Sequence, residues 1–180
     1  MKLRHSLIVG SFTVVVIAVI VWLLLCGHII SSYQEVLVSS GMTLTTQWLE
    51  VKPEKPMKTI ADRNVLLIEV PGLLFDQDKT GHFLLTDGAR FEVEGYLTTD
   101  KGERIYLDRI SVIGHQDKNY LYLYSNGLQW AKRDYHFRSV ALRSSGMVTT
   151  GRAGWVSFDP RTTKDGHAFP DLLMEAPKGK

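Results

Sequence analysis

Residues 91–98, FEVEGYLT, contain the pattern that decides the fold of this chain. Small or apolar residues at positions 91, 93, 95 and 97 alternate with mostly polar residues at 92, 94, 96 and 98. Because successive side chains of a strand point to opposite faces, this alternation indicates a half-buried β-strand. The sequence Asp100–Lys101–Gly102 follows and is typical of a tight turn, so we expect the strand to open a hairpin.

Similar short segments fill the chain from Met42 to Phe158, and Gly, Asp, Asn or Ser turn sequences separate them. No window in this region has a clear 3.6-residue period. Regular short strands joined by turns are typical of an all-β domain. We therefore predict an antiparallel β-sandwich of about 8–10 strands, with a jelly-roll as one variant. It covers residues 42–173, and 174–180 form a flexible tail.

Two local features refine the strand prediction. The apolar phase changes at Asp108–Arg109, which indicates a β-bulge within one strand. Asn126–Gly127 follows the strand at 120–125 and is a tight-turn signal, so we expect a hairpin there.

The apolar run at residues 7–30, LIVGSFTVVVIAVIVWLLLCGHII, determines the predicted location. A membrane-spanning helix needs about 20 such residues. Lys2 and Arg4 precede the run, so residues 1–6 should stay cytoplasmic and the chain beyond 30 should lie outside. Residues 31–41 then form a juxtamembrane linker. The alternatives are a cleaved signal peptide and a lipoprotein modified at Cys26, but the run lacks an A-x-A site and has Leu25 before the cysteine.

The composition of the outer part limits its partners. The chain has 21 basic and 19 acidic residues, and removing Lys2 and Arg4 leaves 19 of each. A neutral domain without a basic stripe argues against nucleic-acid binding. Cys26 is the only cysteine, so no intrachain disulfide can form. The absence of disulfides and glycosylation sequons favours a bacterial envelope protein, in the periplasm or at the cell surface.

A row of tyrosines is the candidate binding site. Tyr120, Tyr122 and Tyr124 alternate with leucines, so the leucines should face the core and the tyrosines the opposite side. Trp130 lies beyond the next predicted turn and extends the row. Such a ridge can anchor a protein partner or stack on sugar rings, and it can also be ordinary strand surface.

No catalytic or metal-binding motif accompanies the row. The sequence contains no G-x-S-x-G and no cysteine nucleophile outside the apolar run. The histidines at 82, 115, 136 and 167 lack the i, i+4 spacing of a helical metal pair. The aspartates at 76, 78 and 87 imitate a calcium loop, but strands flank them, so we interpret this segment as a hairpin turn. We therefore predict no catalytic residue, metal or cofactor.

One segment carries a resemblance to a known family. Residues 91–120, FEVEGYLTTDKGERIYLDRISVIGHQDKNY, resemble part of the OB-fold of periplasmic haem chaperones, which also have one N-terminal membrane helix. The resemblance implies haem-handling roles for His115 and Tyr120. The spacing between these two residues differs by one from that of the family, and about 60 strand-rich residues follow where the family has a loose tail. We retain from it only an OB-like barrel as the alternative fold.

These observations favour a non-catalytic function. We expect a single-pass membrane protein whose outer domain is a binding or assembly module for another envelope protein. The alternatives are binding of envelope polysaccharide through the tyrosine row and, third, an enzyme whose site is assembled by the fold.

Overall fold

The computed structural model describes residues 15–22, 33–77, 82–129, 135–160 and 173. The chain forms two compact units, Met1–Ser32 and Tyr33–Lys180. Residues 15–22 of the first unit are helical. Within the described ranges, no helix combines the length and the apolar character that a membrane crossing requires. The rest of the predicted span at 7–30 lies outside the described residues.

The second unit is built from antiparallel strands, which confirms the all-β prediction. The alternating segment at 91–98 falls on two of them, and the predicted turns at Gly72, Gly88 and Gly102 all have positive φ. The described strands are β1 (Tyr33–Ser39), β2 (Met42–Leu44), β3 (Leu49–Val51), β4 (Met57–Lys58), β5 (Arg63–Glu69), β6 (Leu73–Gln77), β7 (Phe83–Leu85), β8 (Arg90–Phe91), β9 (Val93–Thr99), β10 (Arg104–Tyr106), β11 (Arg109–His115), β12 (Lys118–Tyr124), β13 (His136–Ser144), β14 (Val148–Thr150) and β15 (Ala153–Phe158). A short 3₁₀ helix, η1 (Asn126–Leu128), follows β12.

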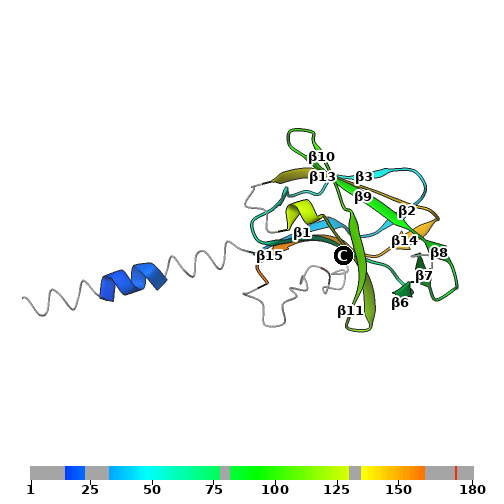
Figure 1. Ribbon diagram of the computed structural model, residues 1–180, viewed down its shortest axis with the longest axis horizontal. Coiled ribbons are helices and arrows are strands. Elements are labelled where there is room, and N and C mark those ends of the chain that lie inside the picture. Colours follow the sequence, from blue (N-terminus) through cyan, green and yellow to red (C-terminus); the bar gives the residue numbers. More distant parts are fainter. Residues whose placement is uncertain (1–14, 23–32, 78–81, 130–134, 161–172, 174–180) are drawn as a thin grey trace, which may run out of the picture. The chain divides into compact units, whose positions relative to one another are not determined.

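Two larger sheets dominate the unit (Figure 1). The first, which we call sheet A, has the order β1-β15-β5-β12-β11. The second, sheet C, has the order β10-β9-β13-β3, and β4 also pairs with β13. Two small sheets, β14-β2 and β6-β7-β8, complete the described strands.

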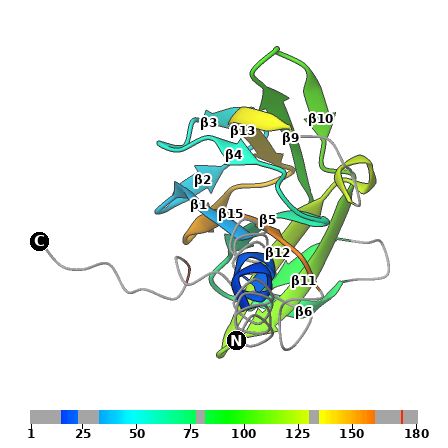
Figure 2. The same ribbon diagram turned by 90° about the vertical axis from the view of Figure 1, so that its left-hand side faces the viewer.

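Side chains of the two larger sheets together form the main apolar core. Figure 2 shows the strands of both sheets in a second view. Sheet A contributes Leu66, Leu121 and Trp155, and sheet C contributes Leu97 and Phe137, all fully buried. The predicted inward phase of residues 91–97 is confirmed, because its apolar members are buried in this core. The main core therefore covers one face of each larger sheet.

Two local predictions are wrong. At Asp108 the chain does not bulge but passes from β10 in sheet C to β11 in sheet A, so the phase change marks a crossing between sheets. Asn126–Gly127 lie in the 3₁₀ helix rather than in a hairpin turn. The hairpin partner of β12 is instead β11, joined through Gln116 and Asp117, which both have positive φ as a two-residue type I′ loop requires.

The domain also begins earlier than predicted. Tyr33–Ser39, which we assigned to a juxtamembrane linker, form β1 and pair with β15 from Tyr33↔Phe158 onward. Val36 and Val38 are buried in the main core, so the predicted linker contains an integral strand of sheet A.

Candidate functional site

The predicted tyrosine row does not form an exposed ridge. Leu121 and Leu123 face the main core as expected, but Tyr120 on the opposite face is only 1% exposed. Tyr122 and Tyr124 are half-buried and meet edge to face, with ring centroids 5.5 Å apart. Trp130 lies outside the described residues. Tyr120 is therefore a core residue, and the premise of a three-tyrosine surface is corrected.

The reason is a second apolar cluster behind sheet A. Tyr120 packs there with side chains from three other segments of the chain, namely Val65, Leu67, Val156, Phe158 and Leu173. The two central strands of sheet A, β5 and β15, are consequently buried on both faces. The tyrosine face of the sheet is thus mainly structural.

A charged pair borders this cluster. Nζ of Lys118 lies 2.6 Å from Oε1 of Glu69, and this hydrogen bond is the main cause that raises the pKa of Lys118. Burial raises the pKa of the Tyr120 hydroxyl, and the nearby Glu69 carboxylate raises it further. A buried phenol with a raised pKa stays neutral, which suits packing rather than proton transfer at neutral pH.

Partly exposed aromatic rings gather instead on the outer face of sheet C. We call Trp48, Tyr96 and Tyr106 the aromatic strip. Trp48 and Tyr106 are 39% and 58% exposed, and Tyr96 lies half-buried between them. The ring centroid of Tyr96 lies 4.8 Å from that of Trp48 and 5.7 Å from that of Tyr106. In each pair the two ring planes are inclined at 58°.

Strand pairing explains how the strip forms. Tyr96 on β9 lies opposite Tyr106 on β10 in the hairpin that the Asp100–Gly102 turn closes. A sequence signal existed for this pair, because both residues are equidistant from Lys101 and Tyr96 occupies the outward phase of β9. Trp48 directly precedes β3, on the other side of β13, and no sequence pattern links it to the two tyrosines.

Two arginines hold the rings of the strip. Cζ of Arg104 lies 4.7 Å from the Tyr96 ring centroid, and Cζ of Arg143 lies 4.7 Å from that of Trp48. Both distances are within the range of cation–π attraction. Arg143 also donates from Nη2 and Nε to one carboxylate oxygen of Glu94, at 2.7 and 3.1 Å. The strip is therefore a contiguous set of rings and guanidinium groups, in which the Glu94 carboxylate anchors Arg143.

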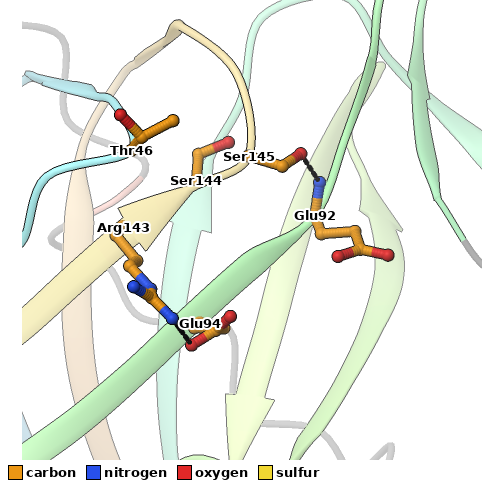
Figure 3. A pocket seen from close by; sticks show the side chains of 6 residues that line it. All are labelled: Thr46, Glu92, Glu94, Arg143, Ser144 and Ser145. Carbon is orange, nitrogen blue, oxygen red and sulfur yellow. Dashed lines mark hydrogen bonds and ion pairs between the residues drawn. The ribbon is translucent and has the colours of Figure 1, made fainter.

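A polar hollow of about 330 Å³ adjoins the strip (Figure 3). It shares Arg143 and Glu94 with the contacts described above, and its other lining residues are Thr46, Glu92, Ser144 and Ser145. The backbone amide of Glu92 donates to Oγ of Ser145 at 2.9 Å, and the amide of Ser145 donates to the carbonyl oxygen of Glu92 at 3.0 Å. These bonds fix the wall of the hollow.

Two histidines of the described residues pair with carboxylates. His82 Nε2 lies 3.3 Å from Glu92, and His136 Nδ1 lies 3.7 Å from Asp100, in two separate pairs. In the described part of the chain, no group of three His, Cys, Asp or Glu residues is arranged to hold a metal ion. Asp78 and His167 lie outside the described residues. What the outer face of sheet C can supply chemically is stacking, apolar contact and charged hydrogen bonding.

A search of protein-family models gives no match for this chain. A comparison with the curated proteins gives none either.

Proposed function

We propose that the chain is a single-pass membrane protein whose extracytoplasmic β-sandwich binds another envelope protein through the aromatic strip and its two arginines. The observation that carries the proposal is the composition of the outer face of sheet C. Trp, Tyr and Arg are the residue types that most often dominate the binding energy of protein interfaces. Here all three occur in contact on one partly exposed surface.

Preorganisation supports this function. Ordering a flexible side chain at an interface costs about 0.5–1.5 kcal/mol. Arg143 is already held by Glu94 and by the ring of Trp48, and Arg104 lies over Tyr96. A partner that docks here therefore meets side chains whose positions are already restricted.

The ring geometry favours a protein over a polysaccharide. A sugar ring stacks on an open aromatic face, but a guanidinium group covers one face of Trp48 and one face of Tyr96. The 58° tilt between neighbouring rings also prevents a flat platform across the strip. A protein surface can instead insert side chains between tilted rings and pair with the arginines.

The experiment uses the full chain in native membranes, with a photoreactive phenylalanine analogue at position 106. Phe75, which is 64% exposed on β6, provides the matched control position. We expect a discrete protein adduct from position 106 and none of the same mass from position 75. A heterogeneous glycan adduct would move the function to polysaccharide binding, and the absence of any adduct from the folded protein would reject the strip as a docking surface.

Alanine substitutions then measure how much the aromatic strip contributes to the binding affinity. Substituting a dominant interface residue with alanine costs at least about 2 kcal/mol, which is roughly a 30-fold loss of affinity. We expect Trp48→Ala and Tyr106→Ala each to weaken binding of the captured partner by about that factor. Phe75→Ala should leave the affinity unchanged.

A further inference from the structure

The polar hollow beside the aromatic strip has an excess of negative charge (Figure 3). Among the described residues that line it, Glu92 and Glu94 are acidic and Arg143 is basic. The other lining residues are serines and a threonine, which carry uncharged hydroxyl groups. Two carboxylates against one guanidinium group leave one negative charge unbalanced at this end of the strip.

Each carboxylate has one oxygen without a partner among the described residues. Arg143 donates from both Nη2 and Nε to Oε2 of Glu94, and Oε1 of Glu94 accepts nothing there. Glu92 meets His82 through Oε1, and its Oε2 has no such contact. The side chains of Glu92 and Glu94 are 56% and 58% exposed. Both oxygens can therefore accept hydrogen bonds from a group that arrives from solvent.

A cationic side chain fits these oxygens. Hydrogen bonds from an ammonium or guanidinium group to a carboxylate are roughly twice as strong as bonds between neutral groups. The volume of about 330 Å³ admits such a side chain together with several waters, since one water in the liquid occupies about 30 Å³. An anionic group would instead be repelled by two carboxylates, and the guanidinium group of Arg143 already bonds one of them.

We propose that the protein that docks on the aromatic strip inserts a lysine or arginine side chain into this hollow, where it pairs with Glu92 and Glu94. The inference rests on the proposed function, because Arg143 both lines the hollow and lies over the ring of Trp48. It gives the docking segment of the partner a basic residue beside the residues that cover the strip. Since exposed ion pairs contribute little binding energy, the pair mainly fixes the orientation of the partner.

The first test places a photoreactive phenylalanine analogue at position 46 of the full chain in native membranes. Thr46 lines the hollow and is exposed, so the probe reaches the incoming side chain without entering the core. We expect an adduct of the same mass as the adduct from position 106. Mass spectrometry of the linked peptide should place a lysine or arginine next to the attachment point, and a segment without either residue would overturn the proposal.

Positions 46 and 106 separate this inference from the proposed function. An adduct from position 106 alone supports docking on the strip and overturns the basic side chain in the hollow. An adduct from position 46 alone, on a segment with a basic residue, supports the hollow and rejects the strip. The absence of any adduct from the folded protein at either position overturns both.

Charge exchange at Glu92 gives the second test, because this carboxylate does not bond Arg143. We expect Glu92→Gln to weaken binding of the captured protein by about two- to fivefold, the effect of losing one exposed ion pair. Glu92→Lys should weaken it by at least about tenfold, since facing like charges at an interface are strongly unfavourable. Reversing the captured basic residue to glutamate should restore binding to the Glu92→Lys chain.

Glu103→Lys is the matched control for general electrostatics. It makes the same charge change at an exposed position outside the hollow. At physiological salt, where charges are screened beyond about 8 Å, its effect should stay below about twofold. Circular dichroism must show that both lysine variants keep the wild-type strand content. Equal losses of affinity from Glu92→Lys and Glu103→Lys would contradict a specific pair in the hollow.

Discussion

The indole Nε1 of Trp155 donates a hydrogen bond to the carbonyl oxygen of Lys58 at 3.0 Å. Trp155 lies on β15 in sheet A, and Lys58 lies on β4, which pairs with β13 in sheet C. This bond therefore joins the two sheets directly across the core. The Trp155 ring also contacts Phe137 of β13 edge to face, with centroids 5.6 Å apart.

Trp155→Phe tests this link between the sheets. The substitution removes the donor and leaves a space beside Phe137, while the ring remains aromatic. We expect the free energy of unfolding to fall by roughly 1–3 kcal/mol, the usual cost of leaving one buried polar group unsatisfied. Denaturant unfolding measures the change, and a loss below about 0.5 kcal/mol would show that solvent replaces the bond.

Gly95→Ala tests the packing on the inner face of β9. A Cβ atom at this position would lie 2.8 Å from Cδ2 of Leu142 and 3.3 Å from Cδ1 of Leu107. Both leucines are buried, so one of them must move. We expect a destabilisation of about 1–3 kcal/mol, as for other overpacked cores. Gly127→Ala is the matched control, since its Cβ would meet nothing closer than 3.7 Å, and its thermal unfolding should resemble that of the wild type.

Asn64→Ala tests a buried polar network between β5, β15 and the 3₁₀ helix. Nδ2 of Asn64 donates to the carbonyl oxygens of Ala61 and Leu128 at 2.8 and 2.9 Å, and Oδ1 accepts from Oγ of Ser157 at 2.7 Å. Removing the amide leaves the two carbonyl oxygens and the Ser157 hydroxyl short of a partner, so we expect a loss of roughly 2–4 kcal/mol. Ser157→Ala in the Asn64→Ala background should cost less than in the wild type; additive losses would show that the residues act separately.

Alkaline pH tests the buried tyrosine face. Burial is the main cause that raises the pKa of Tyr120 and of Tyr122 in the folded protein. Their stabilising effect is therefore complete below the unfolded tyrosine pKa of about 10 and is lost as pH rises towards the folded values.

We accordingly expect the free energy of unfolding of the wild type to decline above about pH 10, and Tyr120→Phe to reduce the steepness of that decline. Denaturant titrations across this range, with Tyr106→Phe at an exposed position as the control, measure the effect. Equal slopes for wild type and Tyr120→Phe would contradict the buried-phenol explanation.

Much of the fold was predictable because strands and turns depend mainly on residues that are close together in the sequence. The alternation at 91–97 and the glycines of the turns at 72, 88 and 102 indicate strands and hairpins without knowledge of distant residues. The change of phase at Asp108 was also visible, but a crossing between sheets and a bulge give the same local pattern. Only the pairing of β10 with β9 and of β11 with β12 distinguishes them.

The candidate site was harder to predict because it depends on which sheet faces are covered. The alternation correctly predicted that Leu121 and Tyr120 lie on opposite faces of the strand. It does not indicate that Leu173 and residues of β15 cover the face with Tyr120. The proximity of Tyr96 and Tyr106 was predictable, because both residues belong to the hairpin closed by the Asp100–Gly102 turn. Trp48 carried none, because β3, the strand that follows it, is separated from β9 and β10 by β13, which lies much later in the sequence.

The pairing of β1 with β15 has a consequence for how the domain folds. β1, the first strand of the domain, pairs with β15, the last strand. β2 also pairs with β14, and a hydrogen bond between these strands joins Met42 to Thr150, 108 positions apart. Contacts so distant in sequence slow folding, because a long loop must close before they form. A growing chain therefore holds β1 without its partner strand β15 until nearly the whole domain has been made, on the order of ten seconds at ordinary synthesis rates. Throughout that interval both sides of an apolar strand are available for wrong pairing, so a chaperone that shields residues 33–39 would act at the earliest stage of the chain's maturation.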